Sequence, residues 1–421
     1  MKKYIVILTV ATLVATGTRA QLGDMIKRKA AEGVKQGAQT GTEKTIDKGI
    51  DKLFKKKDKG NKADSNSGAQ ATNSASPAQA QPSIKTYSKY DFIPGEKIMS
   101  VDDFSQDAVG DFPVKWTTNA SGEVMTVDNH EGKWLNVTKQ GYYIPTFVKG
   151  LPDNFTVEYE VLFIPPGTSA GANTPALAFQ IINAPSGKPT FDNSTDRSYF
   201  ELDPYMGNVD IAAYTKSGEK LLANEFQVKG IQRQSSFTYH VAVWRQKNRL
   251  RVYLNETKVV DAPSLLSPDI KYNAIRFSTS FNNDGSTWLI SNFKLASGLP
   301  DTRNKLLNEG KFSTTGILFD VNSANIKASS YGTLKDIAAV LKENATINVK
   351  IVGHTDSDGD NNANLDLSKK RADAVKTMLV KEFSIEENRL QTDGKGETQP
   401  AVANTNAEGK AQNRRVEFIK L

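Results

Sequence analysis

The chain has no cysteine, only three histidines and no long apolar run after its first residues. Without cysteine it can form no disulfide, no thiolate nucleophile and no cysteine-ligated metal site, and it lacks the residue to which a lipid anchor is attached in bacteria. The histidines, His130, His240 and His354, are scattered along the sequence, so we expect no zinc cluster. Apart from the calcium loop described below, no metal site and no cofactor is expected. His240 alternates with apolar residues, which is typical of a hydrogen-bonded core histidine.

The first 20 residues have the pattern of a secretory signal. Lys2-Lys3 precedes an apolar run over residues 4–14, and Thr18-Arg19-Ala20 ends the signal with small residues around a variable one. The run is about half of the ~20 residues that a membrane-spanning helix needs. We therefore predict a signal peptide at 1–20, cleaved after Ala20, and a periplasmic protein. An uncleaved membrane anchor is the alternative.

Two segments without a core precede the first domain. Residues 21–62 hold 12 Lys and Arg against 6 Asp and Glu, which accounts for most of the net charge of +7. Apolar residues recur every four positions there, but glycines weaken the helix. We expect a basic, partly helical arm that is solvated or lies on an anionic membrane surface. Residues 63–83, rich in Ala, Ser, Gln and Pro, are expected to form a flexible linker. Because the basicity is local, nucleic acid is a poor candidate partner.

Residues 84–300 are dominated by apolar–polar alternation, which predicts many short strands and a two-sheet β-sandwich. The run from Tyr239 to Asp261 resembles the paired strands of laminin-G or concanavalin-like jelly rolls, and residues 290–296 resemble their closing strand. The resemblance implies an interaction module for a glycan or a protein. Its tryptophans could stack on sugars, although a buried position is expected for at least Trp244 and Trp288.

A glycosidase is the rival interpretation of this domain. It needs two carboxylates about 5–9.5 Å apart across a cleft. Glu158/Glu160 and Glu201/Asp203 are each two residues apart on one strand face, so neither pair is excluded. Acidic residues that alternate with apolar ones are more often the solvated face of a strand. We therefore expect no enzymatic activity, and a wall-tethered, carbohydrate-active enzyme is the alternative function.

Residues 301–421 alternate strand-like and helix-like segments, which indicates an α/β domain with at least one parallel strand pair. Strands are expected at 316–320, 347–351 and 416–421, with a helix capped by Ser329 or Ser330 and a second helix over 364–382.

Arg371 is unusual in the second helix because it is a charged residue on the face that we expect to be buried. It lies four residues from both Leu367 and Val375, on a stripe that Met378 and Leu379 continue, and a charge on a buried stripe needs a partner. Asp356 follows the preceding strand. A carboxylate and a guanidinium in one cleft suit a zwitterion, with Asp356 facing an ammonium and Arg371 facing a carboxylate. The alternative is that the two side chains pair with each other.

Five segments together resemble the C-terminal domain family of outer-membrane protein A (OmpA). They are Phe319-Asp-Val-Asn-Ser-Ala-Asn-Ile, Gly353-His-Thr-Asp-Ser-Asp-Gly, Asn364-Leu-Asp-Leu-Ser-Lys-Lys-Arg-Ala, Gly394-Lys-Gly-Glu-Thr-Gln-Pro and Asn413-Arg-Arg-Val-Glu. The resemblance spans nearly all of residues 312–421. It implies non-covalent binding of peptidoglycan at the diaminopimelate of the stem peptide. At the matching positions, Asp356 and Arg371 would grip the free amino-acid group, with supporting roles for Thr355, Asn364, Leu367, Ser368 and Arg415. The alternative for residues 413–415 is that they mainly anchor the last strand.

The sequence departs from the family pattern at two positions. Lys395 stands where an aromatic residue is usual, and Lys410 stands where arginine is frequent. Neither belongs to the expected grip. Nothing upstream resembles the membrane barrel of OmpA, so that anchor is not expected.

The expected architecture is multidomain. An all-β jelly-roll sandwich (84–300) is followed by an α/β OmpA-like domain (301–421), with the basic arm and linker before them. The expected function is a non-catalytic protein of the Gram-negative cell envelope that binds peptidoglycan at the cell wall or outer membrane. A stator-like motor component is a third hypothesis, and it requires an uncleaved N-terminal span.

Two segments have compositions that resemble calcium-binding loops. Asp356-Ser-Asp-Gly-Asp resembles the start of an EF-hand loop, but Asn361 and Leu367 replace the required glycine and glutamate. The loop Asn282-Asn-Asp-Gly285 is a second candidate for calcium binding, which its sequence does not exclude.

Overall fold

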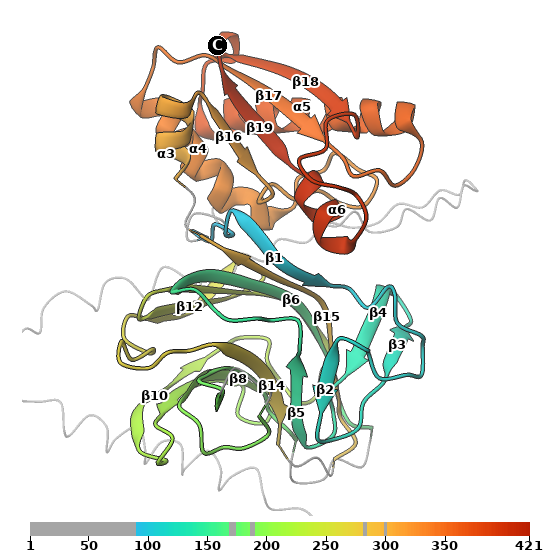
Figure 1. Cartoon of the computed structure of the whole chain (residues 1–421), viewed down its shortest axis with the longest axis vertical. Helices are drawn as coiled ribbons and strands as arrows, with labels where there is room; N and C mark the ends of the chain where they lie inside the picture. The colour runs from blue at the N-terminus through green and yellow to red at the C-terminus, as the bar shows by residue number, and fades with distance from the viewer. Residues whose placement is uncertain (1–89, 168–173, 186–189, 281–283, 299–300) are drawn as a thin grey trace, which may run out of the picture. The chain divides into compact units, whose positions relative to one another are not determined.

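The computed structural model describes residues 90–167, 174–185, 190–280, 284–298 and 301–421 (Figure 1). The predicted signal peptide, basic arm and linker, residues 1–83, lie outside the described residues. So do residues 281–283, which belong to the loop where calcium was left open.

The first part of the described chain consists of β-strands, which we call the two-sheet domain. Its strands are β1 (Lys97–Asp102), β2 (Trp116–Thr118), β3 (Val124–Val127), β4 (His130–Asn136), β5 (Gly141–Pro145), β6 (Asn154–Ile164), β7 (Leu177–Ile182), β8 (Arg197–Asp203), β9 (Asn208–Tyr214), β10 (Lys220–Gln227), β11 (Phe237–Gln246), β12 (Arg249–Leu254), β13 (Thr257–Ala262), β14 (Ala274–Thr279) and β15 (Thr287–Ser297). The first sheet has the order β13-β12-β11-β6-β15-β4-β3, with β1 also paired to β15. The second sheet has the order β10-β9-β8-β7-β14-β5-β2. All of these pairs are antiparallel, as the alternation predicts.

The inward side chains of both sheets form one hydrophobic core. Tyr159 of β6 in the first sheet packs on Phe179 and Phe277 of the second, with ring centroids 5.8 and 5.0 Å apart. This packing follows from the period-two pattern, because every second residue of a strand points to the same face. The prediction that Trp244 and Trp288 are buried is confirmed, and Trp116 and Trp134 are buried as well.

The outer face of the first sheet carries a buried charge cluster. His240 of β11 lies 2.9 Å from Glu160 and 3.3 Å from Glu158, and Lys294 of β15 pairs with Glu158 at 2.7 Å. Burial by itself would lower the pKa of His240, but hydrogen bonds and charge from the two glutamates raise it to about 9. His240 is hydrogen-bonded to Glu160, as predicted, but it lies half-buried on the outer face of the sheet and not in the core. Glu158 and Glu160 form a structural ion cluster with it.

The C-terminal domain is a four-stranded sheet with helices. Its elements are α3 (Thr302–Asn304), η2 (Lys305–Glu309), β16 (Lys311–Thr314), η3 (Ala328–Ser330), α4 (Tyr331–Glu343), β17 (Val349–His354), α5 (Asn361–Phe383), η4 (Glu387–Arg389), β18 (Leu390–Gly396), α6 (Ala407–Asn413) and β19 (Val416–Lys420). The sheet order is β16-β19-β17-β18. β17 and β18 are parallel and α5 connects them, so the predicted parallel pair with a crossover is confirmed. Buried residues of α4, α5 and the strands form one core.

Two local predictions in this domain are wrong. Residues 316–320 form no strand and make a single bridge, Phe319 to Ile326, because the sheet edge is already occupied by β16. The side chain of Ser330 does not cap α4. Its hydroxyl instead donates to the backbone oxygen of Leu318 and accepts from the backbone nitrogen of the same residue, which fixes that loop.

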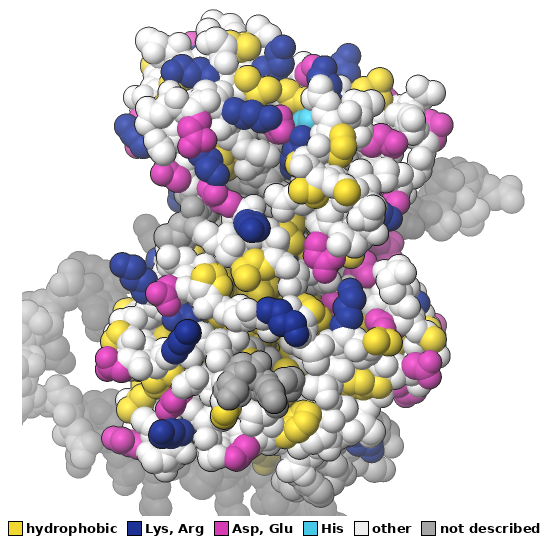
Figure 2. Space-filling model, viewed as in Figure 1, with side chains coloured by type: hydrophobic (Ala, Val, Ile, Leu, Met, Phe, Trp, Pro, Cys, Tyr) yellow, Lys and Arg dark blue, Asp and Glu magenta, His cyan; other side chains and the backbone are white. Residues whose placement is uncertain are grey.

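Among the described residues, no helix has both the length and the apolar character needed to cross a bilayer, and no group of three or more His, Asp or Glu side chains could hold a metal ion. On the described part of the face in Figure 2, basic and acidic side chains are interspersed, and neither sign forms one continuous patch.

Candidate functional site at the end of strand β17

Helix α5 lies directly on the ends of the two parallel strands because both strands carry glycine there. A Cβ atom on Gly353 would lie 2.1 Å from the backbone oxygen of Ser368, and one on Gly394 would lie 2.5 Å from the backbone nitrogen of Lys369. Larger residues would push the helix away. The close packing brings the first turns of α5 beside the segment that leaves β17.

Asp356 follows β17 by two residues and is 8% exposed. The strand end is held on both sides, since the backbone nitrogen of His354 donates to Arg415 O and that of Thr355 donates to Gly396 O, each at 3.0 Å. Asp356 Oδ1 accepts from the backbone nitrogen of Asp358, and Oδ2 lies 2.5 Å from Arg414 Nη1. The carboxylate is therefore fixed in direction.

Arg371 projects from α5 toward the same region. Its Nε donates to Ser323 O at 3.0 Å, and its guanidinium lies 4.9 Å from the ring centre of Phe319. In the part of the chain that the structure describes, neither Nη1 nor Nη2 of Arg371 has a hydrogen-bond partner, and no salt bridge joins it to Asp356. Burial lowers the pKa of Arg371 from its ordinary value, with nearby Asp356 opposing that effect and Arg414 adding to it.

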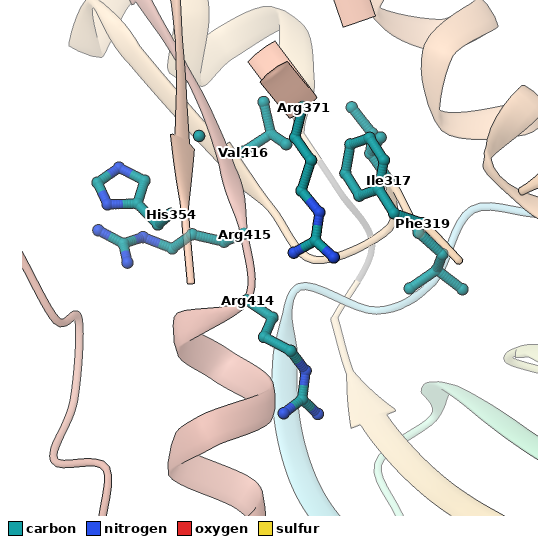
Figure 3. Close-up of a pocket in the computed structure, with 9 residues that line it drawn as sticks. Ile317, Phe319, His354, Arg371, Arg414, Arg415 and Val416 are labelled. Atoms are coloured by element: carbon teal, nitrogen blue, oxygen red, sulfur yellow. The ribbon is translucent and has the colours of Figure 1, made fainter. Parts of the chain in front are cut away.

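A cavity of about 100 Å³ lies beside Arg371. It is lined by Ile317, Leu318, Phe319, Gly353, His354, Arg371, Arg414, Arg415 and Val416. Figure 3 shows the guanidinium of Arg371 between Phe319 and Val416, with Arg414 reaching downward from the end of α6. Arg415 extends away from Arg371, beside the ring of His354. The cavity thus presents an aromatic ring and two guanidinium groups next to a buried carboxylate.

The side chain of Arg415 belongs mainly to an internal cluster. Its Nε and Nη2 donate to Glu417 Oε1 at 3.0 and 2.8 Å, and Nη2 also reaches Gln399 O. Burial would raise the pKa of Glu417, but hydrogen bonds from His354, Lys311 and Arg415 hold it well below its ordinary value. The Nη1 of Arg415 is buried and has no partner among the described residues.

The other predicted supporting residues occupy different positions. Asn364 is buried and donates to Asp358 O and to Glu397 Oε2. Ser368 is fully buried, donating to Leu365 O and accepting from the nitrogen of Gly396, so it joins α5 to the end of β18. Thr355 has a buried hydroxyl that lacks a partner among the described residues, and Leu367 is half-buried.

The predicted apolar stripe of α5 is displaced from the observed one. The buried residues are Asn364, Ser368, Ala372, Val375, Leu379 and Phe383. Leu367 and Met378, expected in the core, are only half-buried. Arg371 therefore lies at the edge of the buried stripe, where its stem packs and its charged end reaches the cavity. The expected helix, 364–382, begins at Asn361 and ends at Phe383.

Arg414 was missed as a partner of Asp356. Strand periodicity could have found it, because Arg415 and Glu417 are two residues apart and share a face, which favours a pair between them. Arg414 then points to the other side, where it lies half-exposed against Asp356. The hypothesis that Asp356 and Arg371 pair with each other is not supported by the observed contacts.

Comparison with known proteins assigns this part of the chain. The sequence model of the OmpA family matches residues 318–414. Residues 318–414 are therefore a domain of the OmpA family, and the resemblance found in the sequence is confirmed.

Curated relatives match over the same part of the chain. It is 43% identical over 102 residues to the probable lipoprotein YiaD of Escherichia coli, covering 24% of this chain and 46% of that protein. It is 40% identical over 101 residues to outer membrane porin F of Pseudomonas aeruginosa, covering 24% and 29%. The chain thus spans less than half the length of these relatives.

A solved structure matches a larger part of the chain. It is the carbohydrate binding module CBM66 from Bacillus subtilis, which is 16% identical, with 44% of this chain and 96% of that chain covered and a TM-score of 0.30. A TM-score this low does not define the topology of the two-sheet domain.

Proposed function

We propose that the C-terminal domain holds the protein non-catalytically to peptidoglycan by gripping the free amino-acid group of diaminopimelate in the stem peptide. The ligand's carboxylate binds the guanidinium of Arg371, and its ammonium binds the carboxylate of Asp356. Membership of residues 318–414 in the OmpA family supports this function. The names of the two curated relatives, a lipoprotein and an outer membrane porin, support a place in the envelope of a Gram-negative bacterium.

The observation that carries the proposal is that the two terminal nitrogens of Arg371, Nη1 and Nη2, make no hydrogen bond within the described residues. We call this pair of nitrogens the fork of Arg371. Two terminal amino groups without partners, beside a cavity, match the two oxygens of a carboxylate. Arg371 is half-buried, so its guanidinium loses part of its hydration without gaining a protein partner, and a ligand carboxylate would offset that loss.

Asp356 can take part without leaving its present partners. A carboxylate offers about four acceptor positions, of which Arg414 and the nitrogen of Asp358 occupy two. An ammonium can therefore join the same group. The buried, unpartnered hydroxyl of Thr355 is a further hydrogen-bonding group beside it. Asn364 and Ser368 act by holding the backbone of the site, and Arg415 acts mainly through Glu417.

The two-sheet domain is proposed to be a jelly-roll, laminin-G-like interaction module over residues 84–300, with the OmpA-like domain over 301–421. Enzymatic activity is less well supported, because Glu158 and Glu160 are engaged by His240 and Lys294. Hydrolysis of a glycosidic bond needs two available carboxylates across a cleft.

Co-sedimentation with isolated peptidoglycan sacculi tests the proposal. Wild type, Asp356→Ala and Arg371→Ala are compared on diaminopimelate walls and lysine-type walls. We expect wild type to pellet with the first wall type only and both variants to remain in the supernatant.

A matched control is available on the exposed side of α5. Asp366 and Lys370 form an exposed pair there, with a distance of 2.6 Å, so Asp366→Ala and Lys370→Ala change the same charges outside the site. Both controls should pellet like wild type. If the site variants also pellet normally, or wild type does not pellet, the proposed grip is wrong.

A further inference from the structure

The outer face of the second sheet is hollowed into a groove of about 560 Å³. Inward residues of its strands, such as Phe179, Phe200 and Phe277, belong to the core, so the residues between them point outward. One row across the sheet pairs Tyr142 of β5 with Ser278 of β14, Ser278 with Ala178 of β7, and Ala178 with Glu201 of β8. The small side chains of Ser278 and Ala178 thus form the floor of the groove. The larger residues at the two ends of the row, Tyr142 and Glu201, are about three strand spacings, roughly 14 Å, apart.

Tyrosine rings stand on both sides of this floor. On one side, Tyr199 and Tyr214 stack with centroids 6.2 Å apart and planes 3° apart, and Arg197 lies 4.5 Å from the Tyr214 ring centre. On the other side, the guanidinium of Arg276 lies 4.1 Å from the ring centre of Tyr142. These contacts fix the rings, and all three tyrosines are only half-buried, so each keeps some surface in contact with solvent.

Arg276 is fully buried and serves as a scaffold for the groove. Its Nε donates to Gln180 Oε1, its Nη1 to the backbone oxygens of Thr190 and Asp192, and its Nη2 to Asn193 Oδ1. Every nitrogen of this guanidinium is used inside the protein. Arg276 therefore holds the segment 190–193 against the sheet and orients two amides that line the groove.

Several polar groups that line the groove remain available to a ligand. Asn119 Oδ1 accepts from the backbone nitrogen of Tyr142, and Asn193 Oδ1 accepts from Arg276, which leaves their amino groups without partners in the described part of the chain. Glu201 also has no partner there, and burial, followed by the charges of Asp210 and Asp203, raises its pKa to about 7. Amides and a carboxyl that is partly protonated at neutral pH can both donate and accept hydrogen bonds.

We propose that this groove binds a neutral saccharide chain. Sugar rings have apolar C–H faces that pack on tyrosine rings and hydroxyl groups that both donate and accept, which is the combination lining the groove. The proposal deepens the interaction role given above to the two-sheet domain.

The lining favours binding of a saccharide over hydrolysis and over binding of a peptide. Glu201 is the one carboxylate among the residues that line the groove, whereas hydrolysis needs two. The groove crosses the central strands β8, β7 and β14, whose backbones already pair on both sides. A peptide could not add there as an extra strand.

Charge also favours a neutral ligand. The basic side chain that lines the groove, Arg197, stacks on Tyr214 and donates to Asn193 O. Arg197 is also offset by Glu201 on the same lining, so the groove carries no excess of positive charge that would select an acidic sugar. Binding should therefore depend little on ionic strength.

A glycan microarray of neutral, amino-sugar and uronic-acid oligosaccharides, followed by calorimetric titration with the neutral hits, tests this site on the full chain. Chitohexaose represents the glycan strand of the wall, and cellohexaose and laminarihexaose represent other polysaccharides. We expect binding to at least one neutral chain, changed less than twofold between 50 and 500 mM salt. Tyr142→Ala and Tyr199→Ala should each weaken it at least tenfold.

Tyr205→Ala is the matched control, because Tyr205 is 53% exposed and outside the groove. Asp356→Ala should bind glycans like wild type, which separates failure of this proposal from failure of the stem-peptide grip. The inference is overturned if no neutral glycan binds, if only acidic glycans bind, or if folded groove variants bind like wild type. Release of shorter sugars from a bound chain would also overturn it in favour of hydrolysis.

Discussion

The two cavities use arginine in different ways: Arg371 is half-buried, and Arg276 is fully buried. At the C-terminal site, Arg371 spends one nitrogen on the backbone of Ser323 and leaves its terminal fork unused. In the groove of the two-sheet domain, Arg276 spends all three nitrogens on the protein. A buried guanidinium whose donors are all satisfied stabilises a scaffold, whereas one with an unused fork is available to an anion. This difference is the basis on which we propose a charged ligand for the first cavity and a neutral one for the second.

The largest expected effect is on stability, from Arg276→Met. The variant keeps much of the side-chain volume but leaves four acceptors without their donor, so we expect a loss of about 3 kcal/mol in unfolding free energy. For a domain of this size the melting temperature should fall by roughly 6–12 °C. Arg371→Met should cost less than ~1 kcal/mol, because it removes one internal hydrogen bond. Differential scanning calorimetry compares them, and equal losses would erase the distinction between the two arginines.

A second test sharpens the role of the Arg371 fork. Arg371→Lys keeps the positive charge but cannot make two parallel hydrogen bonds to a carboxylate. We expect at least a tenfold loss of binding to diaminopimelate walls with an unchanged melting temperature. Lys370→Arg, on the same helix but outside the site, is the control and should bind like wild type. Full binding by Arg371→Lys would mean that only charge matters there.

A third test concerns the charge cluster on the first sheet. The pKa of His240 is about 9 in the folded protein and about 6.5 when unfolded, so its stabilising effect is complete below pH 6.5 and is lost as pH rises through 9. We expect the melting temperature of wild type to fall by several degrees from pH 6.5 to 9.5. The fall should be smaller in His240→Gln, whereas His130→Gln should follow wild type. Parallel curves for all three proteins would show that His240 does not carry the effect.

The smallest expected effect is that of Glu201→Gln. The pKa of Glu201 is raised to about 7, so the folded state favours its protonated form, and this advantage is lost as pH rises through 7. The variant should melt about 2–4 °C above wild type at pH 8, where the ionised carboxylate costs roughly 1 kcal/mol, and at the same temperature as wild type at pH 4. Glu131→Gln, the same substitution at an exposed position of β4 in the other sheet, is the control. A variant that melts below wild type at pH 8 would mean that ionised Glu201 has a stabilising partner.

The sequence predicted those features that depend on local periodicity. Alternation along Tyr239–Trp244 and Trp288–Phe293 predicted strands, and both segments lie in strands, β11 and β15. The position of Arg371 on the helix that follows Asp356 predicted two opposite charges near each other, and Asp356 is close enough to act on the pKa of Arg371. Each of these inferences needs only the period of the element and the order of elements along the chain.

Features that depend on long-range pairing were not predictable from one sequence. The groove exists because β5, β14, β7 and β8 are neighbours, although they are far apart along the chain, so Tyr142 and Tyr199 could not be recognised as two sides of one floor. Residues 316–320 were predicted to form a strand because they are mostly apolar, but the edge of the sheet is occupied by β16 instead. Arg415 was predicted as a supporting residue from the family resemblance alone, which does not show that Arg415 pairs with Glu417 and that Arg414 contacts Asp356.

The central claim is that Arg371 and Asp356 together recognise a zwitterion. Calorimetric titration of the full chain with a stem peptide ending in diaminopimelate, beside the same peptide ending in lysine, tests it most directly. We expect saturable binding of the diaminopimelate peptide only, abolished in Arg371→Ala and in Asp356→Ala and retained in the groove variant Tyr199→Ala. Equal affinity for the two peptides, or undiminished binding by folded Arg371→Ala, would contradict the account.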